Sequence, residues 1–352
     1  MSGGVDSSVS AALLKEQGYN VIGMMLRLWS EAGKENENRC CTIDAMNTAR
    51  YIAGQLDIPF YAVDARQVFH ERIVQATFLD GYAQGITPNP CLQCNRHIRF
   101  GLLLEHALAL GADYLATGHY ARLERAPDGH TRLLRGVDEH KDQSYVLHVL
   151  TQEQLRHALF PVGGIPKAEV RALAQRYNLP VASRPDSQDL CFLAGDDYRN
   201  FLQRHAPRLS IPGPILNTRG EVLGEHTGLP HYTIGQRKGL GMAWHEPLYV
   251  LRKDPQNNAL IVGTRTELGH DELYTGTVNW IGGQPPAAPI RAQVKIRYKA
   301  RDAWGTITPL EDGRVHVRFD EPLRDITPGQ AAVFYDGDVC LGGGIITENR
   351  PI

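Results

Sequence analysis

The first half of the chain alternates between segments with a helical period of apolar residues and short, mostly apolar runs. Residues 7–17 show the helical pattern, and residues 21–28 form an apolar run bounded by turns, as a buried strand does. Further helices are predicted at 45–56, 67–80 and 98–110, and further strands at 58–65 and 113–120. Alternating strands and helices predict a parallel sheet covered on both faces, which is an α/β fold.

From about residue 212 the pattern changes to short alternating runs between turn signals, with more Gly, Pro, Thr and Val. This texture predicts a mostly β second half. The Pro-rich segment 282–289 marks a junction near a further boundary. We therefore expect three domains: a catalytic α/β domain at 1–197, a small, mainly β domain at 198–273 and a C-terminal β-barrel at 274–352.

The composition is that of a globular protein, with 42% hydrophobic and 22% charged residues in a chain of 352. No stretch approaches the roughly 18 consecutive apolar residues of a membrane-spanning helix, and six cysteines are too few for a disulfide scaffold. We therefore expect a cytoplasmic protein with no membrane partner. The formal net charge of -2 gives no general attraction to nucleic acid, so RNA binding would need a local patch.

One such patch is predicted near the C-terminus, where residues 291–301 alternate like an uninterrupted strand. One face of this strand would carry five cations: Arg291, Lys295, Arg297, Lys299 and Arg301. A second strand at 314–320 would pair with it nearby and add three more basic side chains: Arg314, His316 and Arg318. Like charges side by side destabilise a sheet unless something neutralises them, and RNA phosphates would do so.

The chain opens with a loop rich in Gly and Ser that runs into the first predicted helix. The loop consists of Ser2, Gly3, Gly4, Val5, Asp6, Ser7 and Ser8. Glycines let backbone N–H groups converge, hydroxyls add donors, and the helix N-terminus favours an anion. The loop lacks the Gly-Lys-Ser/Thr of a Walker loop. Phosphate binding is therefore one interpretation, and an ordinary capped helix is the other.

Cys91 and Cys94 have a spacing that, in a reducing compartment, indicates metal or sulfur chemistry. Cys94 precedes Arg96, His97 and Arg99 at the start of a predicted helix, and such surroundings favour the thiolate. Half of a zinc site is the structural alternative, but no second pair with suitable spacing occurs. Three other cysteines are interpreted as structural, the last as a buried and inert strand residue: Cys40, Cys41 and Cys340.

Several strings recur in a fixed order along the chain. They are SGGVDSS (2–8), TPNPCLQCNRHIRFG (87–101), GHYA (118–121), KDQSYVL (141–147), RPDSQDLCFL (184–193), YTIGQRKGLG (232–241), IRY (296–298), PGQ (328–330) and CLGGG (340–344). The first resembles the pyrophosphatase-loop signature of enzymes that split ATP between its α and β phosphates. Together the strings resemble the tRNA-specific 2-thiouridylases, the MnmA or TrmU family, from residue 2 to about 346.

The resemblance implies 2-thiolation of the wobble uridine of tRNA, with ATP and Mg²⁺ as cofactors. ATP would adenylate the C2 oxygen, and AMP would leave when sulfur attacks. Cys191 would carry a persulfide from a sulfur donor protein, such as a cysteine desulfurase or a relay carrier. Cys94 would attack that persulfide and end in a disulfide with Cys191, which requires their Cα atoms to come within about 7 Å. The expected substrates are the tRNAs that accept Lys, Glu and Gln.

The family's other functional residues carry over by position. Those that match contacts to ATP are the loop residues Ser2, Gly3, Gly4, Val5, Asp6, Ser7 and Ser8, with Leu26 and Gly118. Those that match contacts to the target base or the tRNA are Asn89, Pro90, Cys91, His119, Lys141, Asp142, Gln143, Arg297, Tyr298 and Gln330. Leu26 and Gly118 follow predicted strands, where a parallel sheet offers its ligand crevice.

Two features depart from the family pattern. Many members have Asp where this chain has Cys91, and a thiol with a pKa near 8.5 cannot take over the acid or base role of a carboxyl group near 3.9. Cys91, Cys94 and Cys191 could instead hold a [4Fe-4S] cluster, an alternative to the persulfide route. The family also has an apolar strand before the loop, whereas this chain begins at the loop. Burying about five such side chains contributes about 7 to 15 kcal/mol, so we expect Met1 to be an internal methionine.

Two other functions remain open from the residues. A pyrophosphatase-loop ligase of small metabolites would share the opening loop but would need neither the paired cysteines nor a basic strand. An inactive tRNA-binding remnant would fit a chain that lacks the expected first strand. ATP–pyrophosphate exchange, or AMP release with tRNA, would separate these alternatives.

Overall fold

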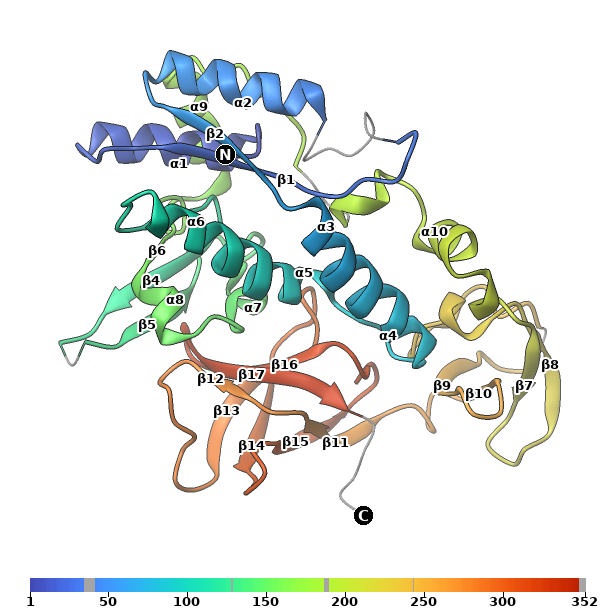
Figure 1. Cartoon of the computed structure of the whole chain (residues 1–352). Coiled ribbons are helices and arrows are strands. Elements are labelled where there is room, and N and C mark those ends of the chain that lie inside the picture. Colours follow the sequence, from blue (N-terminus) through green and yellow to red (C-terminus); the bar gives the residue numbers. More distant parts are fainter. Residues whose placement is uncertain (35–41, 128, 187–189, 243, 348–352) are drawn as a thin grey trace.

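A computed structural model describes residues 1–34, 42–127, 129–186, 190–242 and 244–347 (Figure 1). Cys40 and Cys41 lie outside these residues. An α/β unit, a small β unit and a barrel follow one another along the chain. None of the helices in the described segments combines the length and apolar character needed to cross a bilayer.

The N-terminal unit is built from helices around short parallel strands. Its first elements are α1 (Val5–Glu16), β1 (Gly23–Arg27), α2 (Ile43–Gln55) and β2 (Phe60–Asp64). Strands β1 and β2 pair in parallel, from Gly23 opposite Phe60 to Arg27 opposite Asp64. Helix α2 buries Ala45 and Ala49 against this pair and Ile52 in a cluster with α1, on one face as its period predicts. The predicted α/β fold is confirmed.

The strand predicted at 113–120 is much shorter in the structure. Only β3 (Leu115–Ala116) is extended, and it pairs in parallel with β6 (Ala158–Leu159). The chain then leaves the strand because Gly118 packs against the opening loop and the amide of Tyr120 donates to the side chain of Gln143 at 3.0 Å. Within the described residues of the N-terminal unit, the parallel strands therefore form two separate pairs.

Two long helical stretches cover the end of the first strand pair. The first comprises α3 (Arg66–Phe69), the π-helical η1 (His70–Leu79) and α4 (Asp80–Ala83), near the predicted range. The second comprises α5 (Pro90–Gln93), the π-helical η2 (Cys94–Leu103) and α6 (Leu104–Ala109). The predicted start at residue 98 is wrong. The helix begins at Pro90 because the side chain of Asn89 accepts a hydrogen bond from the amide of Cys91 at 3.2 Å.

The remaining elements of the N-terminal unit lie on both sides of these helices. They are β4 (Ala121–Arg125), β5 (Thr131–Arg135), α7 (Ser144–Leu147), α8 (Gln152–Arg156), α9 (Lys167–Arg176), the 3₁₀ turn η3 (Cys191–Leu193) and α10 (Tyr198–His205). Helix α10 packs Phe201 and Leu202 into the same apolar cluster as Phe69 and Phe78 of the first long helical stretch. The segment up to residue 205 therefore shares a core with the N-terminal unit.

The small β unit forms a four-stranded sheet in the order β8-β7-β10-β9. Its elements are η4 (Pro207–Leu209), β7 (Gly213–Leu216), β8 (Val222–His226), η5 (Leu229–His231), β9 (Tyr249–Asp254) and β10 (Ala259–Gly263). Its own core contains Ile215, Val250, Leu260 and Val262, each fully buried. The predicted β character of this half is confirmed.

The C-terminal unit is a closed six-stranded barrel in the order β11-β15-β14-β13-β16-β17, closed by pairing of β11 with β17. Its elements are β11 (His270–Thr275), β12 (Asn279–Trp280), β13 (Ile290–Lys295), β14 (Ala303–Pro309), β15 (Val315–Leu323), β16 (Ala331–Asp336) and β17 (Val339–Thr347). Cys340 lies in β17, and burial raises the pKa of its thiol to about 12. The prediction of a buried strand residue is confirmed.

The hairpin β4–β5 of the N-terminal unit extends the sheet of the barrel. Strand β5 pairs antiparallel with β17, with Leu133 opposite Cys340 and Leu134 opposite Val339. A single core runs through the junction, because Leu133, Tyr145 and Tyr335 belong to one buried cluster. Figure 1 shows the hairpin reaching down to the barrel. The sequence pattern gave no sign of this connection.

Candidate active site

The opening loop is held in a tight curve by its own side chains. The amide of Ser2 donates to the hydroxyl of Ser7 at 3.1 Å, and the hydroxyl of Ser8 donates to the carbonyl of Gly4 at 2.8 Å. Gly3 has a φ of +69°, and a Cβ there would lie 2.7 Å from the carbonyl oxygen of Ala45. The loop leads directly into α1, whose N-terminus carries the positive end of the helix dipole.

Gly118 lies directly against this loop. A Cβ at this position would come within 2.7 Å of the backbone of Asp6 and Ser7, so only glycine fits. Leu26 lies near the end of β1 and is partly buried. Gly118 is one of the residues matched to ATP contacts, and the fold brings it to the loop from a segment far along the chain.

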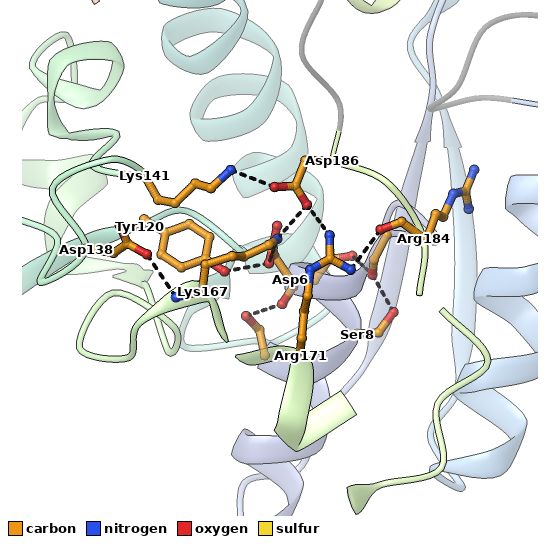
Figure 2. A network of polar contacts seen from close by, with 12 residues as sticks. Asp6, Ser8, Tyr120, Asp138, Lys141, Lys167, Arg171, Arg184 and Asp186 are labelled. Atoms are coloured by element: carbon orange, nitrogen blue, oxygen red, sulfur yellow. Dashed lines mark hydrogen bonds and ion pairs between the residues drawn. The ribbon is translucent and has the colours of Figure 1, made fainter. Parts of the chain in front are cut away.

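Charged side chains from three other segments gather beside the loop (Figure 2). Lys167, at the start of α9, places its Nζ 2.6 Å from Oδ1 of Asp6 and 3.0 Å from Oδ1 of Asp186. The same carboxylate of Asp186 accepts from Lys141 at 2.6 Å and from Arg171 at 2.7 Å. We call Lys141, Lys167 and Arg171 the cation cluster.

Further polar contacts connect the cation cluster with the loop. Tyr120 donates its hydroxyl to Asp6 at 2.7 Å, and burial, followed by this hydrogen bond, raises the pKa of the phenol. Arg184 donates to the carbonyl of Gly3 at 2.6 Å. Burial alone would raise the pKa of Asp186, but hydrogen bonds from Lys141 and Lys167 outweigh it and lower the pKa to about 2. Asp186 is therefore ionised at neutral pH.

Cys94 and Cys191 belong to one apolar cluster although they are far apart in the sequence. Cys94 is 8% exposed and is the first residue of η2, while Cys191 begins η3 and packs against the same cluster. Leu28 and Ala65, which directly follow β1 and β2, lie in this cluster as well. Both cysteines therefore border the apolar cluster at the carboxyl ends of these parallel strands, which is where open α/β sheets bind ligands.

Four residues matched to tRNA contacts are engaged inside the protein. His119 is buried, with its Nδ1 2.8 Å from the hydroxyl of Thr117. Asp142 is buried and accepts from the amides of Gly136 and Ser144, both at 3.0 Å. Gln143 accepts from the amide of Tyr120, and Lys141 belongs to the cation cluster. Each of these side chains therefore has an internal structural task.

The barrel residues matched to tRNA contacts lie at its junction with the N-terminal unit. Gln330 donates to the carbonyl of Thr87 at 2.8 Å, just before the cap residue Asn89. Tyr298 is partly buried, and burial, followed by the charges of Asp142 and Cys91, raises its pKa to about 12. Cys91 itself is exposed. The barrel therefore reaches the segment 87–91, which starts the helix that carries Cys94.

The prediction of an uninterrupted basic strand at 291–301 is wrong. Strand β13 ends at Lys295, and the chain then turns. Arg297 points inward, where it donates to the carbonyl of Ile234 at 3.1 Å and to the hydroxyl of Thr327. These partners come from remote segments, so no local pattern could reveal them.

The predicted pairing of the two basic strands is also wrong. Strand β14 separates β13 from β15 in the barrel. Acidic side chains lie next to three of the basic ones, in the pairs Arg291–Asp320 at 2.5 Å, Arg314–Asp312 at 2.6 Å and His316–Glu272 at 3.1 Å. Neutralisation by RNA phosphates stays a prediction.

Over the described ranges, no three His, Cys, Asp or Glu side chains are arranged to hold a metal ion. Cys91 is exposed whereas Cys94 is buried in an apolar cluster, so Cys91, Cys94 and Cys191 do not form a ligand set for a [4Fe-4S] cluster. Asp6, the acidic residue of the loop, is engaged by Lys167 and Tyr120.

Sequence reasoning missed most of the charged residues beside the loop. Arg184 and Asp186 lie in the string at 184–193, from which only Cys191 was predicted to be functional. Lys167 and Arg171 lie one helical turn apart on α9 and carry no local signal, because lysine and arginine are common on exposed helix faces. Only the fold brings them to the loop.

Three family models cover nearly the whole chain in sequence order. The model described as tRNA methyl transferase HUP domain matches residues 1–195, the tRNA methyl transferase PRC-barrel domain matches 199–264, and the aminomethyltransferase β-barrel domain matches 270–346. The fold and the loop thus define a HUP-domain protein that carries two further β domains.

Curated relatives match over almost their full length. The tRNA-specific 2-thiouridylase MnmA of Moorella thermoacetica is 50% identical over 349 residues, covering 98% of both chains. The MnmA proteins of Acetivibrio thermocellus and Symbiobacterium thermophilum are 46% and 49% identical, over 98% of this chain and 97% and 90% of theirs. The chain belongs to the MnmA family of tRNA-specific 2-thiouridylases.

One solved structure is only weakly similar. The U34-tRNA thiolase NcsA from Methanococcus maripaludis, with its [4Fe-4S] cluster, matches 58% of this chain and 65% of its own at 23% identity. Its TM-score of 0.34 is too low to support an argument about the site.

Proposed function

We propose that the chain is a tRNA-uridine 2-sulfurtransferase that uses ATP and Mg²⁺ to replace the C2 oxygen of the wobble uridine with sulfur. The expected substrates are the tRNAs that accept Lys, Glu and Gln, and the expected compartment is the cytoplasm. The near full-length similarity to MnmA proteins supports the reaction class. The observation that carries the proposal is that Cys94 lies in, and Cys191 packs against, the apolar cluster at the carboxyl ends of β1 and β2.

The first step activates the uridine. The C2 oxygen attacks the α-phosphorus of ATP, and pyrophosphate leaves. The opening loop supports this step because its helix N-terminus and hydroxyls suit a phosphate, and Gly118 leaves room for the loop's backbone. Adenylation converts a poor leaving group into AMP.

The second step transfers sulfur from Cys191, which carries a persulfide received from a cysteine desulfurase or a relay carrier. The thiolate of Cys94 attacks the inner sulfur of this persulfide, so that a Cys94–Cys191 disulfide forms and the terminal sulfur leaves as hydrosulfide. Hydrosulfide attacks C2 of the adenylated uridine, and AMP departs. A dithiol reductant then restores both thiols.

The apolar surroundings of Cys94 and Cys191 support this order of events. A cluster that contains Leu28 and Phe192 excludes water, so the departing hydrosulfide would meet the uridine before it escapes. Tyr298 and Gln330 lie where the barrel meets segment 87–91, and they would position the tRNA next to Cys91.

The test is nucleoside mass spectrometry of tRNA incubated with ATP, a persulfide donor and purified variants. We expect Cys94→Ala and Cys191→Ala to form no 2-thiouridine. Cys340→Ala is the matched control, because this buried thiol lies in the barrel and outside the proposed chemistry. Full activity of the Cys94→Ala or Cys191→Ala variant would contradict the proposal.

Cys91 separates the persulfide route from the cluster route. After anaerobic purification and iron analysis, the persulfide route predicts activity without stoichiometric iron, and Cys91→Ala keeps thiolating. Loss of both iron and activity in Cys91→Ala would overturn the persulfide route in favour of a cluster. ATP–pyrophosphate exchange with a small metabolite in the absence of tRNA would instead indicate a ligase.

A further inference from the structure

We propose that the cation cluster, Lys141, Lys167 and Arg171, binds the β- and γ-phosphates of ATP, and that Asp186 competes with these phosphates for the same cations. The inference rests on the proposed use of ATP. It adds side chains outside the opening loop to the nucleotide site and assigns a role to Asp186.

The geometry places the cation cluster directly on the loop. Lys167 Nζ touches Asp6 of the loop and Asp186 at once, at 2.6 and 3.0 Å, and its side chain is only 10% exposed. Arg171, one turn further along α9, points to the same carboxylate at 2.7 Å (Figure 2). A ligand held by the loop therefore lies within reach of Lys167.

The charge balance of this network favours an anion. Four cations and three carboxylates take part: Lys141, Lys167, Arg171, Arg184, Asp6, Asp138 and Asp186. The N-terminus of α1 adds further positive potential. Cations that leave water need anionic partners, and here three cations share two carboxylates, those of Asp6 and Asp186. A di- or triphosphate brings more charge and more acceptor oxygens to the same groups.

The donor chemistry also suits phosphate. Arginine presents a planar fork of donors that binds two phosphate oxygens at once, while lysine acts as a compact charge. The loop next to them supplies backbone N–H groups and hydroxyls. The β- and γ-phosphates carry most of the negative charge of ATP, so they gain most from three converging cations. Their arrival requires Asp186 to release those cations.

The experiment measures binding of ATP, inorganic pyrophosphate and AMP to the full chain by calorimetry in the presence of Mg²⁺. We expect Lys167→Met and Arg171→Met each to lower the affinity for ATP and for pyrophosphate by at least about tenfold. The affinity for AMP should stay within about twofold of the wild-type value. Arg176→Met is the matched control, since Arg176 lies on the same helix and pairs instead with Glu16 at 3.2 Å. Its affinities should equal those of the wild type.

Asp186→Asn tests the competition. Removing this carboxylate should raise the affinity for ATP and for pyrophosphate by about tenfold and leave the affinity for AMP unchanged. This change is opposite in direction to that expected for Lys167→Met and Arg171→Met. Weaker ATP binding by Asp186→Asn would overturn the competing role. Thermal unfolding of each variant identifies any that fail to fold, and Arg171→Met and Asp186→Asn still decide the question if Lys167→Met does not fold.

Three other outcomes have distinct meanings. If the wild type binds ATP and both Lys167→Met and Arg171→Met bind it equally well, the inference is overturned and the proposed function stands. If these variants lose affinity for tRNA but not for ATP, the cluster is an RNA contact and the inference is also overturned. If the wild type binds neither ATP nor pyrophosphate, the inference and the proposed function fall together.

Discussion

Two histidines in the interior link single residues to the pH dependence of stability. Burial, followed by the charge of Arg99, lowers the pKa of His119 to about 3. Burial also lowers the pKa of His148 to about 4, although its hydrogen bond to the carbonyl of Tyr145 opposes the shift. Both imidazoles are therefore neutral in the folded protein at neutral pH.

We predict that the folded state loses stability as the pH falls from about 6.5 to about 4. In this window the unfolded chain binds protons at His119 and His148 that the folded chain excludes, so each adds a slope of up to about 1.4 kcal/mol per pH unit. Urea unfolding across this range measures it. His119→Gln and His148→Gln should each flatten the slope, whereas His270→Gln, at an exposed position, should not. Equal slopes in all variants would contradict the prediction.

The sequence indicated single residues well where chemistry and spacing coincide. Gly3 does what its residue type suggests, because a positive φ in a tight loop is a local requirement, whereas only the structure shows the close approach of Gly118 and the cap at Asn89. Lys167 and Asp186 could not be found in this way. Lys167 lies 161 residues from its partner Asp6, and Asp186 lies 45 residues from its partner Lys141, so only tertiary structure brings them together.

At the scale of elements, the segment after β13 shows how a remote partner overrides a local pattern. The alternation at 291–301 is that of a strand, but the inward contact of Arg297 with Ile234 and Thr327 turns the chain after Lys295. Lys299 and Arg301 are exposed beyond this turn. In this segment Arg297 therefore makes contacts inside the protein, whereas Lys299 and Arg301 face the solvent.

We predict that Lys299→Gln and Arg297→Gln have different effects. If tRNA phosphates contact the exposed Lys299, its neutral variant should weaken tRNA binding and reduce the slope of log K against log salt by about 1. Arg297→Gln removes an internal hydrogen-bonding group and should lower the free energy of unfolding by about 1 to 3 kcal/mol. Filter binding at several salt concentrations and urea unfolding measure the two effects. An unchanged salt slope in Lys299→Gln would count against an RNA contact there.

Most elements were predictable because their periods are strong. Helices α1 and α2 and strands β1 and β2 lie close to the predicted ranges. The start of the helix that carries Cys94 was misjudged by eight residues, at 98 instead of 90. Its first turns are polar and lack apolar period, and they are fixed by the cap at Asn89 and by the proline that follows it.

At the scale of the whole molecule, the hairpin β4–β5 joins the α/β unit to the barrel. Ion pairs support the junction, with Arg135 2.6 Å from Asp302 and Arg122 2.5 Å from Asp338. Because Leu133 is fully buried in the shared cluster, the two units share part of their stability. The sequence of the hairpin does not indicate which strand it pairs with, because every strand edge offers the same unpaired backbone N–H and C=O groups.

We predict that Leu133→Ala destabilises both units together. Loss of this buried side chain should cost about 2 to 5 kcal/mol. Hydrogen exchange should then accelerate in β16 and β17 as well as in β4 and β5. Arg132→Ala, at the exposed neighbouring position, is the control and should leave exchange unchanged. Faster exchange confined to β4 and β5 would show that the units are independent.

The hairpin also sets a condition on the substrate. A strand shared between the two units fixes the position of the barrel relative to the apolar cluster that contains Cys94. In the proposed reaction, adaptation must then come from the RNA, whose anticodon loop would have to open and turn its base toward that cluster. We expect an anticodon arm stiffened by extra base pairs to be a poor substrate, however well it is held.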